Sequence, residues 1–179
     1  MTELISDKYN FKRLVSANRI CEGWEADRVD TGERCLVKCL SSDESLDGTL
    51  AREVFLNSFR NQKELRSARI LRARSHSSEN GTLCIEYPYL DPADWQPLTP
   101  ELFARHVLSA LTQICAISDY LHAFGLVHCD LKLGNFLMRT AADRIELILV
   151  DMDFLSRDDS RPGAVVMGTP DHIPPEIAG

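Results

Sequence analysis

The eight residues HCDLKLGN, at positions 128–135, decide how the rest of this sequence is interpreted. They place a carboxylate at Asp130, an amine at Lys132 and a carboxamide at Asn135 within one short loop after a long helical pattern. Each residue type has a frequency of about 1/20. The probability that five fixed positions match by chance somewhere in the chain is therefore on the order of 10⁻⁴. The spacing therefore indicates a site that does chemistry, in preference to an ordinary solvated loop.

Other short stretches stand before and after this loop in a definite order. An apolar strand, residues 147–150, leads into the sequence Asp151-Met152-Asp153, and the run GTPDHIPPE follows at 168–176. A strand that ends in acidic residues is common for structural reasons, so its position after the loop is what favours a function. In the front half, Lys38 ends an apolar strand and Glu53 lies on the helical pattern that follows it.

In this order the stretches resemble the motifs of the eukaryotic-type serine/threonine protein kinase domain. The resemblance covers about residues 11–176. It implies an α+β, two-lobed protein-kinase-like fold, with an N-terminal antiparallel sheet plus a helix and an incomplete helical C-lobe. We expect the N-lobe over residues 1–88 and a partial C-lobe over residues 89–179, which holds the catalytic loop, the metal-binding strand and the activation segment.

The resemblance also implies roles in phosphoryl transfer. Asp130 would accept the proton of the substrate hydroxyl, and Lys132 would contact the transferred phosphate. Asn135 and Asp151 would bind Mg²⁺, with Asp153 as the alternative to Asp151.

A second set of residues would bind ATP. Lys38 would contact the α- and β-phosphates, and we expect Glu53 to pair with it and orient it. Residues 84–87 resemble the hinge of the family, where backbone groups of Glu86 and Tyr87 would hydrogen-bond adenine and Ile85 would be the gatekeeper.

Two features depart from the family pattern. The stretch 16–26, where kinases carry several glycines that allow backbone amides to approach phosphate, contains only Gly23. Glu22 and Glu25 near the phosphates would weaken nucleotide binding further. Cys129 stands where many kinases have an arginine that pairs with a phosphorylated activation loop, and a cysteine cannot form that ion pair.

The resemblance predicts an ATP-dependent serine/threonine protein kinase. The altered glycine region and the Asp151-Met152-Asp153 sequence favour an alternative, a pseudokinase that acts as a binding or regulatory module. A small-molecule phosphotransferase is a further alternative, and the segment 168–176 argues against it in favour of a protein substrate.

Composition excludes several other classes of function. The chain has 179 residues, a net charge of -7 and 44% hydrophobic residues, which predicts a globular protein without the basic patches that nucleic acid or anionic lipid requires. Six cysteines without a CxxC pair indicate neither a zinc site nor a disulfide framework, so we expect reduced and mostly buried thiols. No signal peptide or membrane span is recognised, and a cytoplasmic location is predicted.

The hydrophobic pattern predicts the elements. We expect strands at 20–28, 33–40, 82–87 and 145–150, and a further short strand that precedes the turn 140–144. We expect helices from Leu50 to about Arg74 and from Thr99 to about Phe124, and a polar turn at 77–81. We also expect self-association, or a partner or C-terminal extension that covers the incomplete C-lobe. The apolar residues expected to lose part of their cover are Leu111, Ile114, Leu121, Leu131 and Phe136.

Overall fold

The computed structural model describes residues 6–18, 20–41, 48–79, 81–142 and 144–157. The chain forms two compact units: Met1–Lys63 with Arg72–Tyr89, and Glu64–Leu71 with Leu90–Gly179. The sequence interpretation places all of residues 1–88 in the first unit. In the structure the segment Glu64–Leu71 belongs to the second unit.

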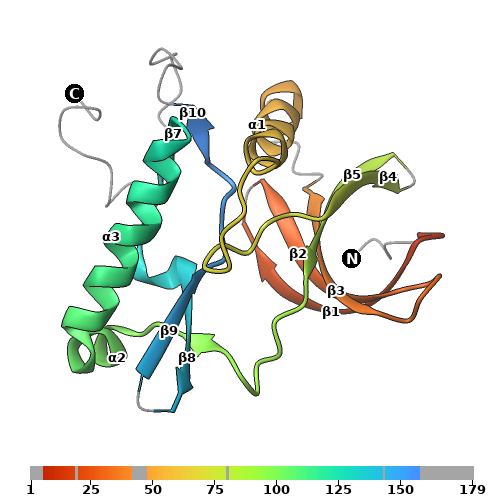
Figure 1. The fold of residues 1–179 in the computed structure, drawn as a ribbon. Coiled ribbons are helices and arrows are strands. Elements are labelled where there is room, and N and C mark those ends of the chain that lie inside the picture. The colour runs from red at the N-terminus through yellow and green to blue at the C-terminus, as the bar shows by residue number, and fades with distance from the viewer. Residues whose placement is uncertain (1–5, 19, 42–47, 80, 143, 158–179) are drawn as a thin grey trace. The chain divides into compact units, whose positions relative to one another are not determined.

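The first unit contains one antiparallel sheet of five strands in the order β1-β2-β3-β5-β4 (Figure 1). The strands are β1 (Tyr9–Ala17), β2 (Cys21–Arg28), β3 (Arg34–Leu40), β4 (Ser75–Glu79) and β5 (Thr82–Pro88). One face of this sheet carries a small apolar core that includes Tyr9, Ala26, Cys35 and Val37. Strands β2, β3 and β5 lie where their apolar or alternating residues predict them, and so does the later strand β9 (Arg144–Leu149).

β4 corrects the sequence interpretation, because it lies where a polar turn is expected. Its residues, SHSSE, carry no strand-forming apolar pattern. β4 is an edge strand that pairs only with β5, and the ring of His76 packs on Phe59 with 4.6 Å between the ring centroids. The strand is therefore held by its neighbours and could not be identified from its own composition.

The helix of the first unit, α1 (Gly48–Asn61), is shorter than the expected helix from Leu50 to Arg74. The side-chain amide of Gln62 explains the end of the helix, since Nε2 donates to the carbonyl of Ser58 at 3.0 Å and Oε1 accepts the Ala73 amide at 3.0 Å. The buried residues of α1 are Ala51, Phe55, Ser58 and Phe59. Leu50, expected on the apolar face, is 38% exposed.

The second unit packs two helices against a β-hairpin (Figure 1). Its elements are β6 (Gln96–Pro97), α2 (Pro100–Arg105), α3 (Val107–Ala123), β7 (Leu126–Val127), the 3₁₀ turn η1 (Leu133–Asn135), β8 (Phe136–Ala141), β9 (Arg144–Leu149) and β10 (Ser156–Arg157). The helix begins as predicted, because Thr99 Oγ1 accepts the Leu102 amide at 3.3 Å. The prediction of one continuous helix is wrong, however, because the helix is interrupted at His106 and forms α2 and α3.

The core of the second unit lies between α3 and the hairpin and includes Leu121, Phe136 and Leu149. The expectation that Leu121 and Phe136 lose cover is wrong, because each is 1% exposed. Leu111 and Leu131 are 44% and 39% exposed, as expected. Among the helices in the described ranges, none has the length and apolar character that crossing a membrane requires.

Candidate active site

The β8–β9 hairpin brings Asn135 next to Asp151. The last pair in its register joins Phe136 to Leu149, and just beyond it the Val150 amide donates to the Asn135 carbonyl at 2.9 Å. Asn135 and Asp151 therefore leave the hairpin at the same end, although 16 positions separate them in the sequence.

The loop 128–135 is closed by its own polar groups. Asn135 Nδ2 donates to the Asp130 carbonyl at 2.8 Å, and the Asn135 amide donates to the Lys132 carbonyl at 3.0 Å. The ammonium of Lys132 lies 2.8 Å from Asp130 Oδ2. Asp130 and Asn135 are 5% and 4% exposed, while the Lys132 side chain keeps 31% of its surface exposed. Carboxylate, amine and carboxamide are therefore held together, as the sequence spacing predicts.

His128 is a positioning residue to which the sequence interpretation gave no role. Its ring is buried, its Nε2 lies 2.5 Å from the Asp151 carbonyl, and its Nδ1 accepts the Asp130 amide at 3.3 Å. A carbonyl can only accept and an amide can only donate, so the imidazole carries its proton on Nε2 and is neutral. Burial lowers the pKa of His128, which favours that neutral form. His128 thus joins the loop to the segment that carries Asp151.

Cys129 adopts a left-handed backbone conformation between two anchored neighbours, with φ of 64°. This conformation costs a non-glycine residue about 1 kcal/mol or more. It allows the Asp130 amide to reach His128 while Asp130 itself is held by Lys132 and Asn135.

Gln113 is a second residue that the sequence interpretation missed. It lies on α3 and bonds the outer edge of β9: Nε2 donates to the Ile145 carbonyl at 3.0 Å, and Oε1 accepts the Leu147 amide at 3.0 Å. Its position among the buried residues Ala110 and Ile117, three before and four after it, is the signal that could have identified it. Gln113 thereby fixes the strand that leads to Asp151.

The other end of β9 is bonded to the segment Glu64–Leu71, which belongs to the second unit. The Leu149 amide donates to the Arg69 carbonyl at 2.9 Å, and the Leu71 amide donates to the Leu149 carbonyl at 2.8 Å. β9 is consequently bonded along both edges up to the residue before Val150.

The oxygen atoms available here fit a magnesium ion. Because Nδ2 of Asn135 is used by Asp130, its Oδ1 remains to bind a cation, and Asp151 adds a carboxylate. The Asp153 amide donates to Asp151 Oδ1 at 3.3 Å, and Asp153 itself is 4% exposed. The described residues contain no cluster of three or more His, Cys, Asp or Glu suited to a metal. One amide oxygen and one carboxylate are compatible with Mg²⁺, which typically takes one or two carboxylates and completes its shell with phosphates and water.

In the first unit, Lys38 lies in β3 directly opposite Ile85 in β5. The residue is 7% exposed, and its ammonium lies 5.8 Å from the centroid of the Tyr87 ring. The Tyr87 hydroxyl accepts from Gln62 Nε2 at 3.4 Å. Lys38, Ile85 and Tyr87 therefore share the face of the sheet that does not carry the Tyr9 core.

The expected ion pair between Lys38 and Glu53 is wrong for this structure. Within the described part of the first unit, Glu53 is exposed and no ion pair joins it to Lys38. Two residues turn an α-helix by about 200°, so Glu53 lies opposite the face that buries Ala51 and Phe55. The burial of Phe55 and Phe59 determines which face of α1 packs on the sheet, and Glu53 is left on the opposite, exposed face.

Glu86 has a structural environment that the hinge interpretation did not foresee. Its fully buried carboxylate accepts the Tyr9 hydroxyl at 2.8 Å and lies 3.4 Å from Arg28 and 3.8 Å from Lys8. Burial and the contact with Glu86 raise the pKa of Tyr9. The Glu86 carbonyl already accepts the Arg74 amide at 2.7 Å, so one of its two lone pairs is used. The adenine contacts of Glu86 and Tyr87 stay a prediction.

The turn between β1 and β2 satisfies its own amides. Asn18 Oδ1 accepts the amides of Ile20 and Cys21, each at 2.8 Å. These amides lie in the stretch that would have to approach phosphate. A Cβ at Gly23 would meet only Ser16 Oγ, the end of a side chain that can rotate away, so packing does not require glycine there.

Glu25 does not add uncompensated negative charge to this region. Its carboxylate lies 2.9 Å from Arg13 and 3.5 Å from Arg34. Glu22 accepts the indole N–H of Trp24 at 3.2 Å. The weak phosphate binding predicted from the sequence would therefore follow from the occupied amides more than from the two acidic residues.

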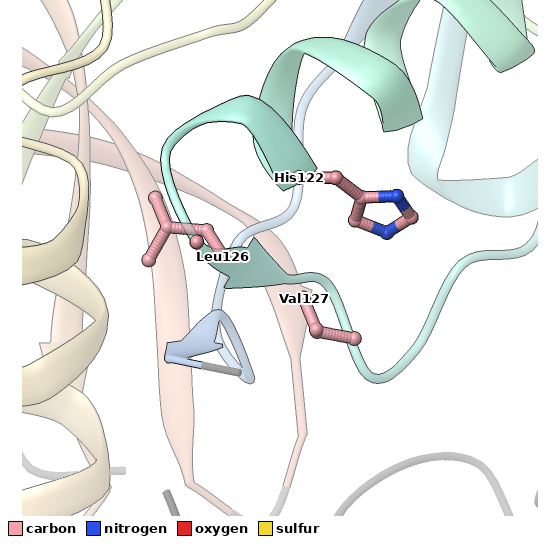
Figure 2. A pocket seen from close by; sticks show the side chains of 4 residues that line it. His122, Leu126 and Val127 are labelled. Atoms are coloured by element: carbon pink, nitrogen blue, oxygen red, sulfur yellow. The ribbon is translucent and has the colours of Figure 1, made fainter. Parts of the chain in front are cut away.

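The segment 168–176, expected to bind the protein substrate, lies outside the described residues. A hollow of about 280 Å³ beside the end of α3 is lined by His122, Gly125, Leu126 and Val127, and Figure 2 shows three of these side chains around it. None of the eight predicted site residues, all of which are described, lines that hollow.

Comparison with known proteins supports the same family. The model of the protein kinase domain family matches residues 22–179. The serine/threonine-protein kinase PknA of Mycobacterium tuberculosis is 30% identical over 97% of this chain and 42% of its own length. The calcium/calmodulin-dependent protein kinase type 1 of Caenorhabditis briggsae is 23% identical over 98% of this chain and 50% of its own length. The chain thus spans half or less of the length of these relatives.

Solved structures show the fold. The crystal structure of the PknI kinase domain of Mycobacterium tuberculosis superposes with a TM-score of 0.62 at 19% identity, and the match covers 86% of this chain and 62% of that one. A double mutant of the same domain gives a TM-score of 0.63 at 20% identity, over 87% and 62% of the two chains. The expected protein-kinase-like fold is confirmed. With a family model that matches most of its residues, this chain belongs to the protein kinase domain family.

Proposed function

We propose that the chain transfers the γ-phosphoryl group of ATP to a serine or threonine hydroxyl of a protein substrate. The observation that carries the proposal is the hydrogen-bonded group of Asp130, Asn135 and the Asp151 segment in the second unit. The family and its serine/threonine kinase relatives support the reaction class.

In the proposed reaction, Asp130 positions the substrate hydroxyl and accepts its proton as the oxygen attacks phosphorus. The ammonium of Lys132, 2.8 Å from Asp130 Oδ2, would turn toward the transferred phosphate and offset its charge. The ammonium of Lys132 beside the Asp130 carboxylate favours the ionised form of Asp130. A proton acceptor has to be in that form. Asn135 and His128 would keep the loop in one geometry during this transfer.

Mg²⁺, when bound with ATP, would neutralise the phosphate oxygens and orient the γ-phosphoryl group. Asn135 Oδ1 and the Asp151 carboxylate are the oxygen ligands that we assign to it. Lys38 would contact the α- and β-phosphates from the first unit. Glu53 could orient Lys38 only after α1 turns, so in the conformation described Lys38 would have to bind ATP without it.

An assay of acceptor residue and nucleotide binding tests this proposal. The chain is incubated with magnesium, γ-labelled ATP and peptides that contain serine, threonine or tyrosine as the single hydroxyl residue. We expect label on serine and threonine peptides and a magnesium-dependent rise in melting temperature with ATP. A magnesium-dependent rise without any transfer would instead identify a binding module. Transfer to tyrosine alone would overturn the acceptor assignment.

A further inference from the structure

The thiols of Cys39 and Cys84 meet in the interior of the first unit. The two residues are directly opposite each other in the register of β3 and β5, and their Sγ atoms lie 2.8 Å apart. They are 2% and 0% exposed. The other cysteines comprise buried Cys21 and Cys35 and exposed Cys115 and Cys129.

The register of β3 and β5 is compatible with a disulfide at this position. Residues directly opposite in an antiparallel pair have Cα atoms about 4.5–5.5 Å apart, which falls within the range of about 4.4–6.8 Å for disulfides. A sulfur–sulfur bond is about 2.05 Å long, so the Sγ atoms need to approach by less than about 1 Å. Side-chain rotation can supply that movement without a shift of the strands.

We propose that Cys39 and Cys84 form an oxidation site, at which a peroxide converts the thiol pair into an intramolecular disulfide that joins β3 to β5. One thiolate attacks a peroxide oxygen and becomes a sulfenic acid, with loss of hydroxide when the oxidant is hydrogen peroxide. The second thiol then attacks the sulfenic sulfur and water leaves. In total, two thiols and one peroxide yield one disulfide and two water molecules, and the peroxide is reduced.

The reaction at this site is slow compared with oxidation of the exposed cysteines. Burial shields both sulfurs, and the hydrogen bond with Cys84 together with burial raises the pKa of Cys39, which makes its reactive thiolate scarce. Peroxide reaches the pair only when the ends of β3 and β5 separate locally. The site therefore responds to sustained oxidation, and it does not act as a rapid sensor.

The disulfide acts on the strand that carries Lys38. The pair Lys38 and Ile85 is adjacent in the register to the pair Cys39 and Cys84. Because side chains alternate between the two faces of a sheet, the disulfide lies on the face opposite to Lys38. It fixes the separation and register of β3 and β5 and leaves the Lys38 face unobstructed. The inference does not depend on the proposed phosphoryl transfer.

Peptide mapping of the oxidised protein tests the site. The chain is treated with hydrogen peroxide, which is then removed by catalase, and is unfolded in iodoacetamide without a reductant before digestion. We expect a peptide that links Cys39 to Cys84 and disappears on treatment with dithiothreitol. Oxidation of exposed Cys115 serves as the internal sign that peroxide acted. Peroxide treatment is continued well beyond complete oxidation of Cys115, since the buried pair reacts more slowly. Carbamidomethylation of both Cys39 and Cys84 after that prolonged treatment overturns the proposal, as does a link from Cys39 to Cys21 or Cys35.

Thermal unfolding tests the consequence for the sheet. The two cysteines are 45 positions apart, and closing a loop of this length should raise the melting temperature of the oxidised protein by at least about 5 °C. Cys39→Ser is the matched control, in which peroxide should give no such rise. If Cys39→Ser does not fold, the linked peptide and its reversal in the unaltered chain decide. An unchanged or lower melting temperature of the linked protein contradicts the stabilising role of the bond.

Discussion

Replacement of Gln113 by methionine tests how the structure holds the strand that leads to Asp151. Methionine has a similar length and volume, but it has no N–H to donate and its thioether sulfur is only a weak acceptor, so it cannot replace the bonds that Gln113 makes with β9. The Ile145 carbonyl and the Leu147 amide, each bonded to Gln113 at 3.0 Å, would lose these partners. Because Ile145 and Leu147 are 6% and 1% exposed, water cannot easily replace the lost bonds.

The expected loss in the free energy of unfolding follows from these two groups. A buried backbone group left without a partner costs about 1–3 kcal/mol. Part of this cost is offset because the buried amide of Gln113 no longer has to be desolvated. We therefore expect Gln113→Met to lower the free energy of unfolding of the second unit by about 2–4 kcal/mol.

Urea unfolding followed by circular dichroism measures this loss, and hydrogen exchange at the Leu147 amide reports whether it is local. Gln96→Met, a change at an exposed glutamine in β6, is the matched control and should alter stability by less than about 0.5 kcal/mol. Exchange at Leu147 should be faster in Gln113→Met than in the control. A loss below about 0.5 kcal/mol with unchanged exchange would show that Gln113 does not hold β9.

Three further predictions concern the nucleotide and the buried carboxylate. Asn18→Ala should raise the affinity for magnesium-ATP by about three- to tenfold in calorimetry, since it frees two turn amides, and an unchanged affinity would show that they do not meet phosphate. Asp151→Asn should abolish most of the magnesium dependence of ATP binding and Asp153→Asn should not, and the reverse result would move the metal role to Asp153. Tyr9 has a raised pKa when folded, so its stabilising effect is complete below about pH 10 and is lost as the pH rises through the folded value. In urea unfolding, Tyr9→Phe should lose about 1–3 kcal/mol at pH 7, because Glu86 loses a donor, and should lose less on going to pH 11 than the unaltered chain does.

The loop 128–135 and the hairpin after it could be predicted because their information is local. Asp130, Lys132 and Asn135 lie within six consecutive residues, so one loop brings their backbones together. The apolar run before Asp151 predicts the strand that returns this residue to Asn135. The fold class follows from the order of these motifs, since each one occupies a set place in the family.

The remaining features depend on tertiary packing. Glu53 lies next to Arg52 on a predicted helix, but only the burial of Phe55 and Phe59 decides which face of α1 it occupies. Glu86 was assigned by its place in a motif, whereas its buried carboxylate depends on Tyr9, which is 77 positions away. The sequence pattern of a single element does not determine how a helix is rotated about its axis on a sheet. It also does not identify a partner on a distant strand.

The central claim is that Asp130 serves phosphoryl transfer to a protein hydroxyl. The most direct measurement is the initial rate of transfer from magnesium-ATP to a serine or threonine peptide by the unaltered chain, by Asp130→Asn and by Asp119→Asn, which changes an exposed carboxylate on α3. We expect transfer by the unaltered chain and by Asp119→Asn, and a loss of at least about 100-fold in Asp130→Asn, because a positioned proton acceptor contributes about 10²–10⁴-fold. Equal rates in all three proteins, or no transfer by the folded and ATP-bound unaltered chain, would contradict the claim.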